Sequence, residues 1–261
     1  MKERPLQLHT ARLQLLPIRE SDEADMLRIF LNPDVCKTYM IPRFQSRDEA
    51  VRLFHRFREL SEDSDRVVFG IYLQGRLIGF LNDVLREEDS IEVGYVIHPD
   101  YQNNGYATEA VSAVVQMLFS VGYTTVKAAA FAGNIASMRV MEKCGMERTG
   151  QEETVLYREA EYRCICYAVS IDSPAVKKQV MDRVQWMEHC FDLLSHTFTT
   201  MPSACDSRWF RELLAILIRY YEGGQWMIDY TLDENGYFPR EMKRGILSQD
   251  AVYHFLTQTE Q

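Results

Sequence analysis

The stretch Gln102–Ala107 has the residue types and spacing of a site that binds an anion through backbone amides. An alternating apolar segment ends at Pro99, and a short polar loop leads into an amphipathic segment that begins at Ala107. The first turn of a helix carries unpartnered N–H groups and the positive end of the helix dipole, so it binds phosphate without a cationic side chain. Gly105 lets the backbone approach a phosphate closely, and Ala107 is small. The sequence therefore predicts an anion site at this turn.

Two other kinds of phosphate-binding loop do not fit this stretch. No Gly-Lys-Ser/Thr sequence is present at the turn, so the loop is not that of a nucleoside-triphosphate-binding protein. One glycine stands where a dinucleotide-binding fold needs three. A single glycine also occurs in strand–helix turns that bind nothing. The residues alone leave an anion site and a plain turn as alternatives.

The elements that follow and precede this loop predict a mixed α/β domain. Residues 67–73 and 76–85 flank the turn Gln74-Gly75 and predict a hairpin, because β-branched and aromatic residues dominate them. An early hairpin sheet with later strand–helix–strand units is typical of an α+β mixed sheet. The other expected elements are a strand over 91–98, a helix over 107–121, a strand over 126–131, a helix over 135–144 and a closing hairpin over 147–154 and 162–169.

The first 60 residues predict one strand and two helices. Alternation around Leu13 and Leu15 indicates the strand. A helix is expected up to Phe30, where Asn32-Pro33 should stop it. The second helix starts after a capping box of Ser46 and Glu49.

A second, helical region follows a short linker over 171–175, so we expect domains over 1–172 and 173–261. Helices are expected over 176–199, 207–222 and 249–256, with an irregular stretch over 225–243. Residues 220–251 are dense in Gly, Trp, Asp and Tyr and are similar to a small, uncharacterised bacterial helical domain family. This region is either a small aromatic core or a surface for a protein partner or a homodimer.

Composition is that of an ordinary globular protein, with 46% hydrophobic residues and a net charge of −9. Nucleic-acid binding needs a basic face, and this balance argues against it. An acidic surface suits a cationic amine substrate, although net charge also simply keeps a protein soluble. The six cysteines form no C-x-x-C pair, so we expect free thiols and no metal site. With no signal peptide and no membrane span expected, a cytoplasmic location follows.

The loop Gln102–Ala107 resembles the Gln/Arg-x-x-Gly-x-Gly/Ala signature of the GNAT superfamily of N-acetyltransferases. The wider context resembles the ribosomal-protein N-terminal acetyltransferase branch of that superfamily. Four further segments agree in the family's order, and the resemblance spans residues 8–170. These segments are Thr10–Leu15, Glu92-x-Gly94-Tyr95, Glu109-Ala110, and Asn134–Ser137 with Lys143–Met146.

The resemblance implies the GNAT fold and acetyl-CoA as co-substrate. Its pyrophosphate is expected on the amides of the loop. Its pantetheine arm is expected against backbone that is exposed where one strand separates from its neighbour. The residues expected to bind it are Val96, Ile97, Gln102, Asn103, Asn104, Gly105, Tyr106, Ala107, Asn134 and Ser137.

The same resemblance implies that an amine attacks the thioester directly in a ternary complex, with Glu92 as general base. On an alternating strand Glu92 shares the face of Gly94 and Val96; the alternative is a solvated strand carboxylate. Met141 stands where many family members have a tyrosine as general acid, and methionine cannot donate a proton. Ser137 matches a serine that the branch can use as general acid instead. The alternative for Ser137 is a helix serine that bonds its own backbone.

One departure leaves the acceptor open. A glutamate that the branch uses in the closing hairpin is matched by Leu156, with Glu152, Glu153 and Tyr157 as the nearest substitutes. A protein N-terminus and a small-molecule amine are both possible acceptors. A longer acyl donor is a further option. A non-catalytic acyl-CoA-binding or partner-binding module with a degraded site is the alternative function.

Four other residues near these motifs are expected to be structural. Tyr95 and Tyr106 are expected to pack, His98 to be polar surface, and Cys144 to lie in the core.

Overall fold

The computed structural model describes residue 5 and residues 7–259, and the chain divides into two units, Met1–Ser173 and Pro174–Gln261. The division falls at Pro174, which begins a long helix. Proline suits the first position of a helix because its missing N–H would have no partner there. Each unit is described by itself below.

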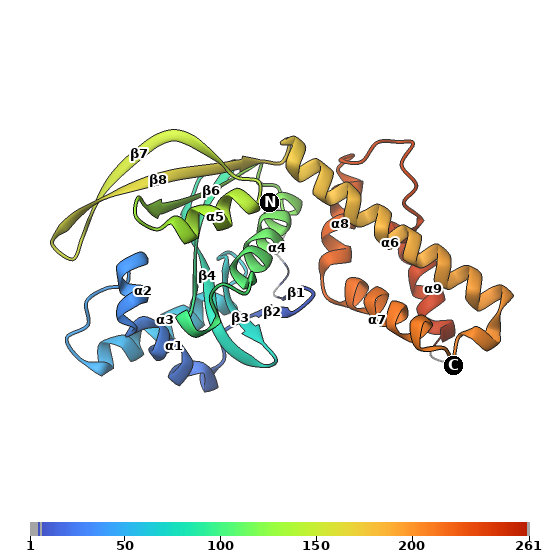
Figure 1. Cartoon of the computed structure of the whole chain (residues 1–261), viewed down its shortest axis with the longest axis horizontal. Helices are drawn as coiled ribbons and strands as arrows, with labels where there is room; N and C mark the ends of the chain where they lie inside the picture. The colour runs from blue at the N-terminus through green and yellow to red at the C-terminus, as the bar shows by residue number, and fades with distance from the viewer. Residues whose placement is uncertain (1–4, 6, 260–261) are drawn as a thin grey trace. The chain divides into compact units, whose positions relative to one another are not determined.

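An eight-stranded mixed sheet forms the first unit (Figure 1), as the α/β prediction required. Its strand order is β1-β2-β3-β4-β5-β6-β8-β7, and among the described residues β5 and β6 are the only neighbouring strands that run parallel. The hairpin turn has positive φ at both Gln74 and Gly75, the backbone that matches the twist of two antiparallel strands. The strands are β1 Leu8–His9, β2 Leu13–Leu16, β3 Val68–Leu73, β4 Arg76–Arg86, β5 Ser90–Ile97, β6 Thr125–Phe131, β7 Glu147–Tyr157 and β8 Ala160–Ser170.

Helices cover both faces of this sheet. On one face Phe30, Phe54 and Phe80 are buried in a cluster that also holds Val96 of β5. On the other face, the neighbouring residue Tyr95 contacts the helix that follows β6. The five helices are α1 Glu23–Phe30, α2 Pro33–Thr38, α3 Arg47–Glu62, α4 Tyr106–Ser120 and α5 Ile135–Lys143.

Asn32-Pro33 follows the end of the first helix, as expected, and it also begins a second helix, α2, that was not expected from the sequence. Asn32 leaves the helical conformation, and its side chain then accepts hydrogen bonds from the amides of Asp34 and Val35. Pro33 occupies the first position of α2. The pair therefore stops α1 and caps a second helix, because Asn is a favoured N-cap residue and proline a favoured first residue.

The second unit consists of helices α6 Pro174–Thr200, α7 Arg208–Glu222, α8 Gln225–Glu234 and α9 Gln249–Thr259. The expectation of an irregular stretch over 225–243 was wrong for its first part, which is α8. Gly224 ends the preceding turn in a left-handed conformation, and Trp226, Ile228 and Leu232 bury one face of the helix. None of the helices among the described residues is long and apolar enough to cross a membrane.

Polar side chains of this unit bond to other groups of the same unit. Asp229 is fully buried and accepts hydrogen bonds from Arg183 and from the hydroxyl of Tyr220, 2.9 Å away. The indole N–H of Trp226 donates to the carbonyl of Ile246 at 2.7 Å. Arg244 pairs with Asp233 at 2.6 Å. These side chains thus account for much of the motif-like pattern over 220–251.

Candidate active site

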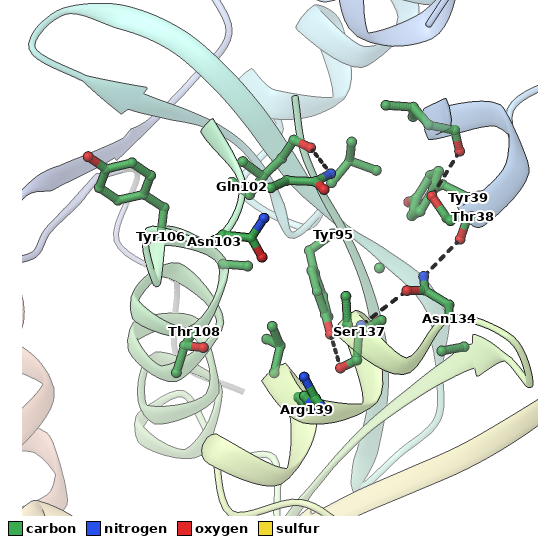
Figure 2. Close-up of a pocket in the computed structure, with 18 of the residues that line it drawn as sticks. Thr38, Tyr39, Tyr95, Gln102, Asn103, Tyr106, Thr108, Asn134, Ser137 and Arg139 are labelled. Carbon is green, nitrogen blue, oxygen red and sulfur yellow. Dashed lines mark hydrogen bonds between the residues drawn. The ribbon is translucent and has the colours of Figure 1, made fainter. Parts of the chain in front are cut away.

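A cavity of about 410 Å³ lies beside β5, α4 and α5, which is a size typical of small-molecule sites (Figure 2). Most of the residues expected to bind the cofactor line it. These are Val96, Ile97, Gln102, Asn103, Gly105, Tyr106, Ala107, Asn134 and Ser137. Asn104 and Glu92 are the two expected site residues that do not line it.

The cavity opens where β5 and β6 separate. The two strands pair only at Ser90, Ile91 and Glu92, which lie opposite Thr125, Val126 and Lys127. Beyond that point β5 runs to Ile97 and β6 to Phe131 without pairing to each other. Backbone groups of Val93–Ile97 that would face a neighbouring strand therefore face the cavity. Such an edge can pair with an extended polar ligand.

Gly105 sets the start of α4 and holds a left-handed conformation, with φ of +81°. That conformation suits glycine because it has no Cβ. The first amide bonded within α4 is that of Glu109, which donates to the carbonyl of Gly105. The amides of Tyr106, Ala107 and Thr108 precede it at the positive end of the helix, and their residues line the cavity.

Side chains of the loop brace its backbone. Gln102 donates from its amide to the carbonyl of Ile97 at 2.9 Å and so ties the loop to the end of β5. The Asn104 side chain donates to the carbonyls of Tyr101 and Gln102. Asn104 thus shapes the loop rather than facing the cavity with its side chain.

Asn134 and Ser137 stand together at the start of α5. The Asn134 side chain caps the helix by accepting from the Ser137 amide at 3.1 Å, and its NH₂ donates to the carbonyl of Thr38 at 3.4 Å. The Tyr95 hydroxyl lies 2.8 Å from Ser137 Oγ and 3.0 Å from the Ser137 carbonyl oxygen (Figure 2). The expectation that Tyr95 only packs was therefore too narrow, since it presents a hydroxyl to the cavity beside Ser137.

Glu92 lies at the point where the two strands separate, as the last residue of β5 that pairs with β6. Burial raises the pKa of its carboxyl group, the carboxylate of Glu153 raises it further, and Lys127 partly lowers it. A raised pKa makes a carboxylate a stronger proton acceptor. On the same strand face, Gly94 leaves room for Tyr39, whose hydroxyl would lie 2.6 Å from an added Cβ.

The closing hairpin contributes one of its three expected substitutes to this region. Glu153 is close enough to raise the pKa of Glu92. Glu152 pairs instead with Arg163 at 3.3 Å. The Tyr157 hydroxyl donates to the backbone carbonyls of Cys36 and Ile41, so it supports the fold. Leu156 is 76% exposed, and its apolar side chain cannot supply the carboxylate of the branch's glutamate.

Residues 12–147, just over half of the chain, match the family model of the acetyltransferase (GNAT) domain. The chain belongs to the GNAT acetyltransferase family. It is an acyl-CoA-dependent acetyltransferase with the mixed sheet of that family. Residues 184–261 match the model of a domain of unknown function, DUF4298.

Known proteins resemble this acetyltransferase over its first unit. The uncharacterised N-acetyltransferase YoaA of Bacillus subtilis is 29% identical over 156 residues, which cover 58% of this chain and 88% of YoaA. A GNAT acetyltransferase of Bacillus anthracis has the same fold, with a TM-score of 0.56, 24% identity and coverage of 64% of this chain and 99% of that one. The microcin self-immunity acetyltransferase MccE, solved with acetyl-CoA and AMP, shares the fold with a TM-score of 0.55 at 15% identity, over 62% of this chain and 93% of MccE.

Arg139, Lys143 and Tyr95 are among the residues of the acetyltransferase cavity that had no part in the sequence-based site. Arg139 and Lys143 project from one face of α5 at a spacing of four, and Tyr95 comes from β5. The spacing of the two cations on a predicted helix was a usable signal, whereas the position of Tyr95 depends on how α5 packs on the sheet. The described residues contain no group of three or more His, Cys, Asp or Glu side chains that could hold a metal ion.

Two other expectations for the acetyltransferase have definite outcomes. His98 is buried rather than on the surface, and its ring accepts from the amide of Asp100. Cys144 is a core residue as expected, and burial raises the pKa of its thiol to about 12. A thiol held protonated in this way is a poor nucleophile.

Proposed function

We propose that this acetyltransferase transfers the acetyl group of acetyl-CoA to a primary amine by direct attack in a ternary complex. The observation that carries the proposal is the separation of β5 and β6 above Glu92, with the Gly105 loop at the other end of the same cavity. One end of the cavity suits an anion. The carboxylate of Glu92 lies outside the cavity lining, at the point where β5 and β6 separate. We infer that the pyrophosphate lies on the loop and the pantetheine arm along β5.

The residues expected to bind the cofactor divide by the chemistry they offer. The amides of Tyr106, Ala107 and Thr108 suit the pyrophosphate because they stand at the positive end of α4. The unpaired edge of β5, where Val96 and Ile97 line the cavity, suits the amides of the pantetheine arm. Asn134 can hold the arm while its side-chain oxygen caps α5.

In this proposal Glu92 accepts a proton from the ammonium form of the acceptor, and the neutral amine attacks the acetyl carbon. The carbon–sulfur bond breaks and its electron pair goes to sulfur. The nitrogen releases its second proton as the amide forms, and the thiolate takes up one proton to give free coenzyme A. Ser137 is the assigned donor, and the Tyr95 hydroxyl lies 2.8 Å from its Oγ. General acid–base help of this kind is worth about 10²–10⁴-fold in rate. The hydroxyl pair and the half-buried carboxylate favour catalysis over a purely binding role.

The acceptor in this proposal is a cationic amine. Glu92 and Glu153 place two carboxylates on one side of the open edge, and the charge of −9 for the chain favours approach of a cation. The exposed Leu156 gives no support to the substrate of the ribosomal-protein branch. A protein N-terminus and a small-molecule amine both satisfy this chemistry.

The loop assignment is tested by the melting temperature with and without acetyl-CoA, for the wild type and for Gly105→Glu. A ligand at about 100 times its Kd adds roughly 2.7 kcal/mol to the stability of the native state. We expect acetyl-CoA to raise the melting temperature of the wild type and to leave that of Gly105→Glu unchanged, because the glutamate places a negative charge at the anion site.

Gly75→Glu is the matched control, since Gly75 has a φ of +82° and no neighbour within 4 Å of an added Cβ. It carries the same backbone strain and the same charge in the hairpin turn, away from the cavity. We expect it to keep the full rise with acetyl-CoA. The proposal fails if the wild type shows no rise at millimolar acetyl-CoA, or if Gly105→Glu still shows it.

A further inference from the structure

An ion pair joins the start of the chain to the first turn of α4. The carboxylate of Glu109 accepts from the hydroxyl of Thr10 at 2.5 Å and from the backbone amide of Arg12 at 2.8 Å. It also accepts from the guanidinium of Arg12, with both Nε and Nη2 at 2.7 Å from Oε2. Glu109 is thus held by four donors, although 97 positions separate it from Arg12.

The same arginine also contacts the loop on both sides of Gly105. Its Nη1 donates to the carbonyl of Asn104 at 3.0 Å. Its guanidinium lies over the ring of Tyr106, 4.6 Å from the centroid. An added Cβ at Gly105 would lie 3.4 Å from Nη2. Arg12 is therefore part of the wall behind the left-handed turn.

This ion pair is half exposed, and such pairs usually add little to stability. Its location gives it another consequence. Glu109 lies in the first turn of α4, so its carboxylate competes with any bound anion for the positive end of the helix and repels that anion. Arg12 cancels that charge and leaves the amides of Tyr106–Thr108 facing a neutral surrounding.

We propose that Arg12 is a positioning residue for the donor: it neutralises Glu109 and supports the Gly105 turn, so that the start of α4 can bind the pyrophosphate of the acyl donor. The inference rests on the proposed function, because it assigns the pyrophosphate to this loop. It makes residue 12 a determinant of how strongly the enzyme prefers a donor with a pyrophosphate over one without.

The test compares acetyl-CoA with acetyl-pantetheine, which has the same thioester and arm but no pyrophosphate. We expect Arg12→Gln to lower kcat/KM for acetyl-CoA about tenfold, through KM rather than kcat, by exposing the Glu109 charge. Its kcat/KM for acetyl-pantetheine should match that of the wild type. Two variants should recover most of the loss with acetyl-CoA. Arg12→Lys keeps the positive charge without the planar guanidinium, and Arg12→Gln/Glu109→Gln removes both charges.

Arg76→Gln is the matched control, because Arg76 is an equally exposed arginine of the same unit and pairs with Asp25. It should leave the ratio of kcat/KM for acetyl-CoA to kcat/KM for acetyl-pantetheine unchanged. The inference is overturned if Arg12→Gln lowers kcat/KM equally for both donors, or if the double variant has no higher kcat/KM for acetyl-CoA than Arg12→Gln. If Arg12→Gln does not fold, the double variant and Arg12→Lys still decide, since a purely geometric role requires both to fail with acetyl-CoA.

Failure of the proposed function gives a different result. In that case the wild type itself uses acetyl-pantetheine as well as acetyl-CoA, or uses neither. A wild type that prefers acetyl-CoA, together with an Arg12→Gln variant that keeps this preference, contradicts only the inference about Arg12.

Discussion

Two regions of this chain are rich in motif-like polar residues and differ in what their polar groups do. In the second unit, Asp229, Arg183 and Tyr220 bond to one another in a buried network. In the first unit, Gly105 begins a helix whose first amides face a cavity, and β5 leaves an open edge beside it. The network in the second unit uses up its hydrogen-bonding capacity, whereas the helix start and strand edge in the first unit leave capacity for a ligand.

The difference teaches that motif density does not separate a binding site from a structural network. Buried polar groups are almost always satisfied, so a dense polar motif needs either internal partners or a ligand. Trp226 and Arg244 have internal partners in Ile246 and Asp233. The loop that includes Gly105 has bracing from its own side chains but leaves the helix terminus available. The following predictions test that contrast, starting with the largest effect.

Arg183→Met should destabilise the second unit by about 3–5 kcal/mol, because it leaves the buried carboxylate of Asp229 without its cation. Urea unfolding followed by tryptophan fluorescence measures this, since Trp186, Trp209 and Trp226 are the chain's three tryptophans and all lie in that unit. Acetyl-CoA binding should not change.

The control is Arg208→Met, which removes an exposed arginine paired with Glu212 on the same unit. It should change the free energy of unfolding by less than about 1 kcal/mol. Equal effects of the two substitutions would mean that the buried network is not what holds the second unit.

Glu92→Gln should lower kcat at least about 100-fold if Glu92 is the base, with little change in KM for acetyl-CoA. Activity of the wild type should fall as pH drops through the raised pKa of Glu92, since the base must be ionised. Because the folded-state pKa is raised, Glu92 contributes stability below its unfolded pKa and loses that contribution as pH rises through the folded value. Glu92→Gln should therefore unfold at higher urea than the wild type at pH 8 but not at pH 4.

Glu153→Gln sharpens this assignment. It removes the repulsion that helps to raise the pKa of Glu92, so the acid limb of the pH–kcat/KM profile should move to lower pH. An unmoved limb, or an active Glu92→Gln enzyme, would exclude Glu92 as the base while leaving the loop assignment intact.

Tyr95→Phe should lower kcat about tenfold with little change in KM for acetyl-CoA, because Ser137 loses a hydroxyl partner in the cavity. The double variant with Ser137→Ala should be no slower than Ser137→Ala alone, since Tyr95 acts through Ser137. Tyr167→Phe is the control: that hydroxyl donates to Glu142 on α5 and does not line the cavity. Additive losses in the double variant would separate Tyr95 from Ser137.

Much of the first unit followed from local patterns. Alternation and turn residues predicted β3 to β5, and the Gly105 turn followed from residue type at a strand–helix junction. The helices that were not expected, α2 and α8, each begin where one residue pair also ends the helix before it. Asn32-Pro33 stops α1 and also starts α2, and the glycines before Gln225 end α7 and also begin α8.

The candidate site was predictable only where its residues are consecutive. The loop and the Asn134–Ser137 helix start are local, and most of the expected residues line the cavity. Arg12 and Glu109 meet across 97 positions, and no periodicity links them. Tyr95 reaches Ser137 only because α5 packs on that strand face. Such contacts depend on tertiary packing, which a single sequence does not encode in any short window.

The short ladder between β5 and β6 also has a mechanical meaning. Three residue pairs are all that join the β1–β5 half of the sheet directly to the β6–β8 half in the described chain. Any rotation of one half against the other turns about this short seam, which moves Ile97 and Phe131 farther than Glu92. The Glu92 carboxylate therefore lies near the axis of any such rotation. A change in the width of the gap between β5 and β6 would leave the proposed base nearly in place.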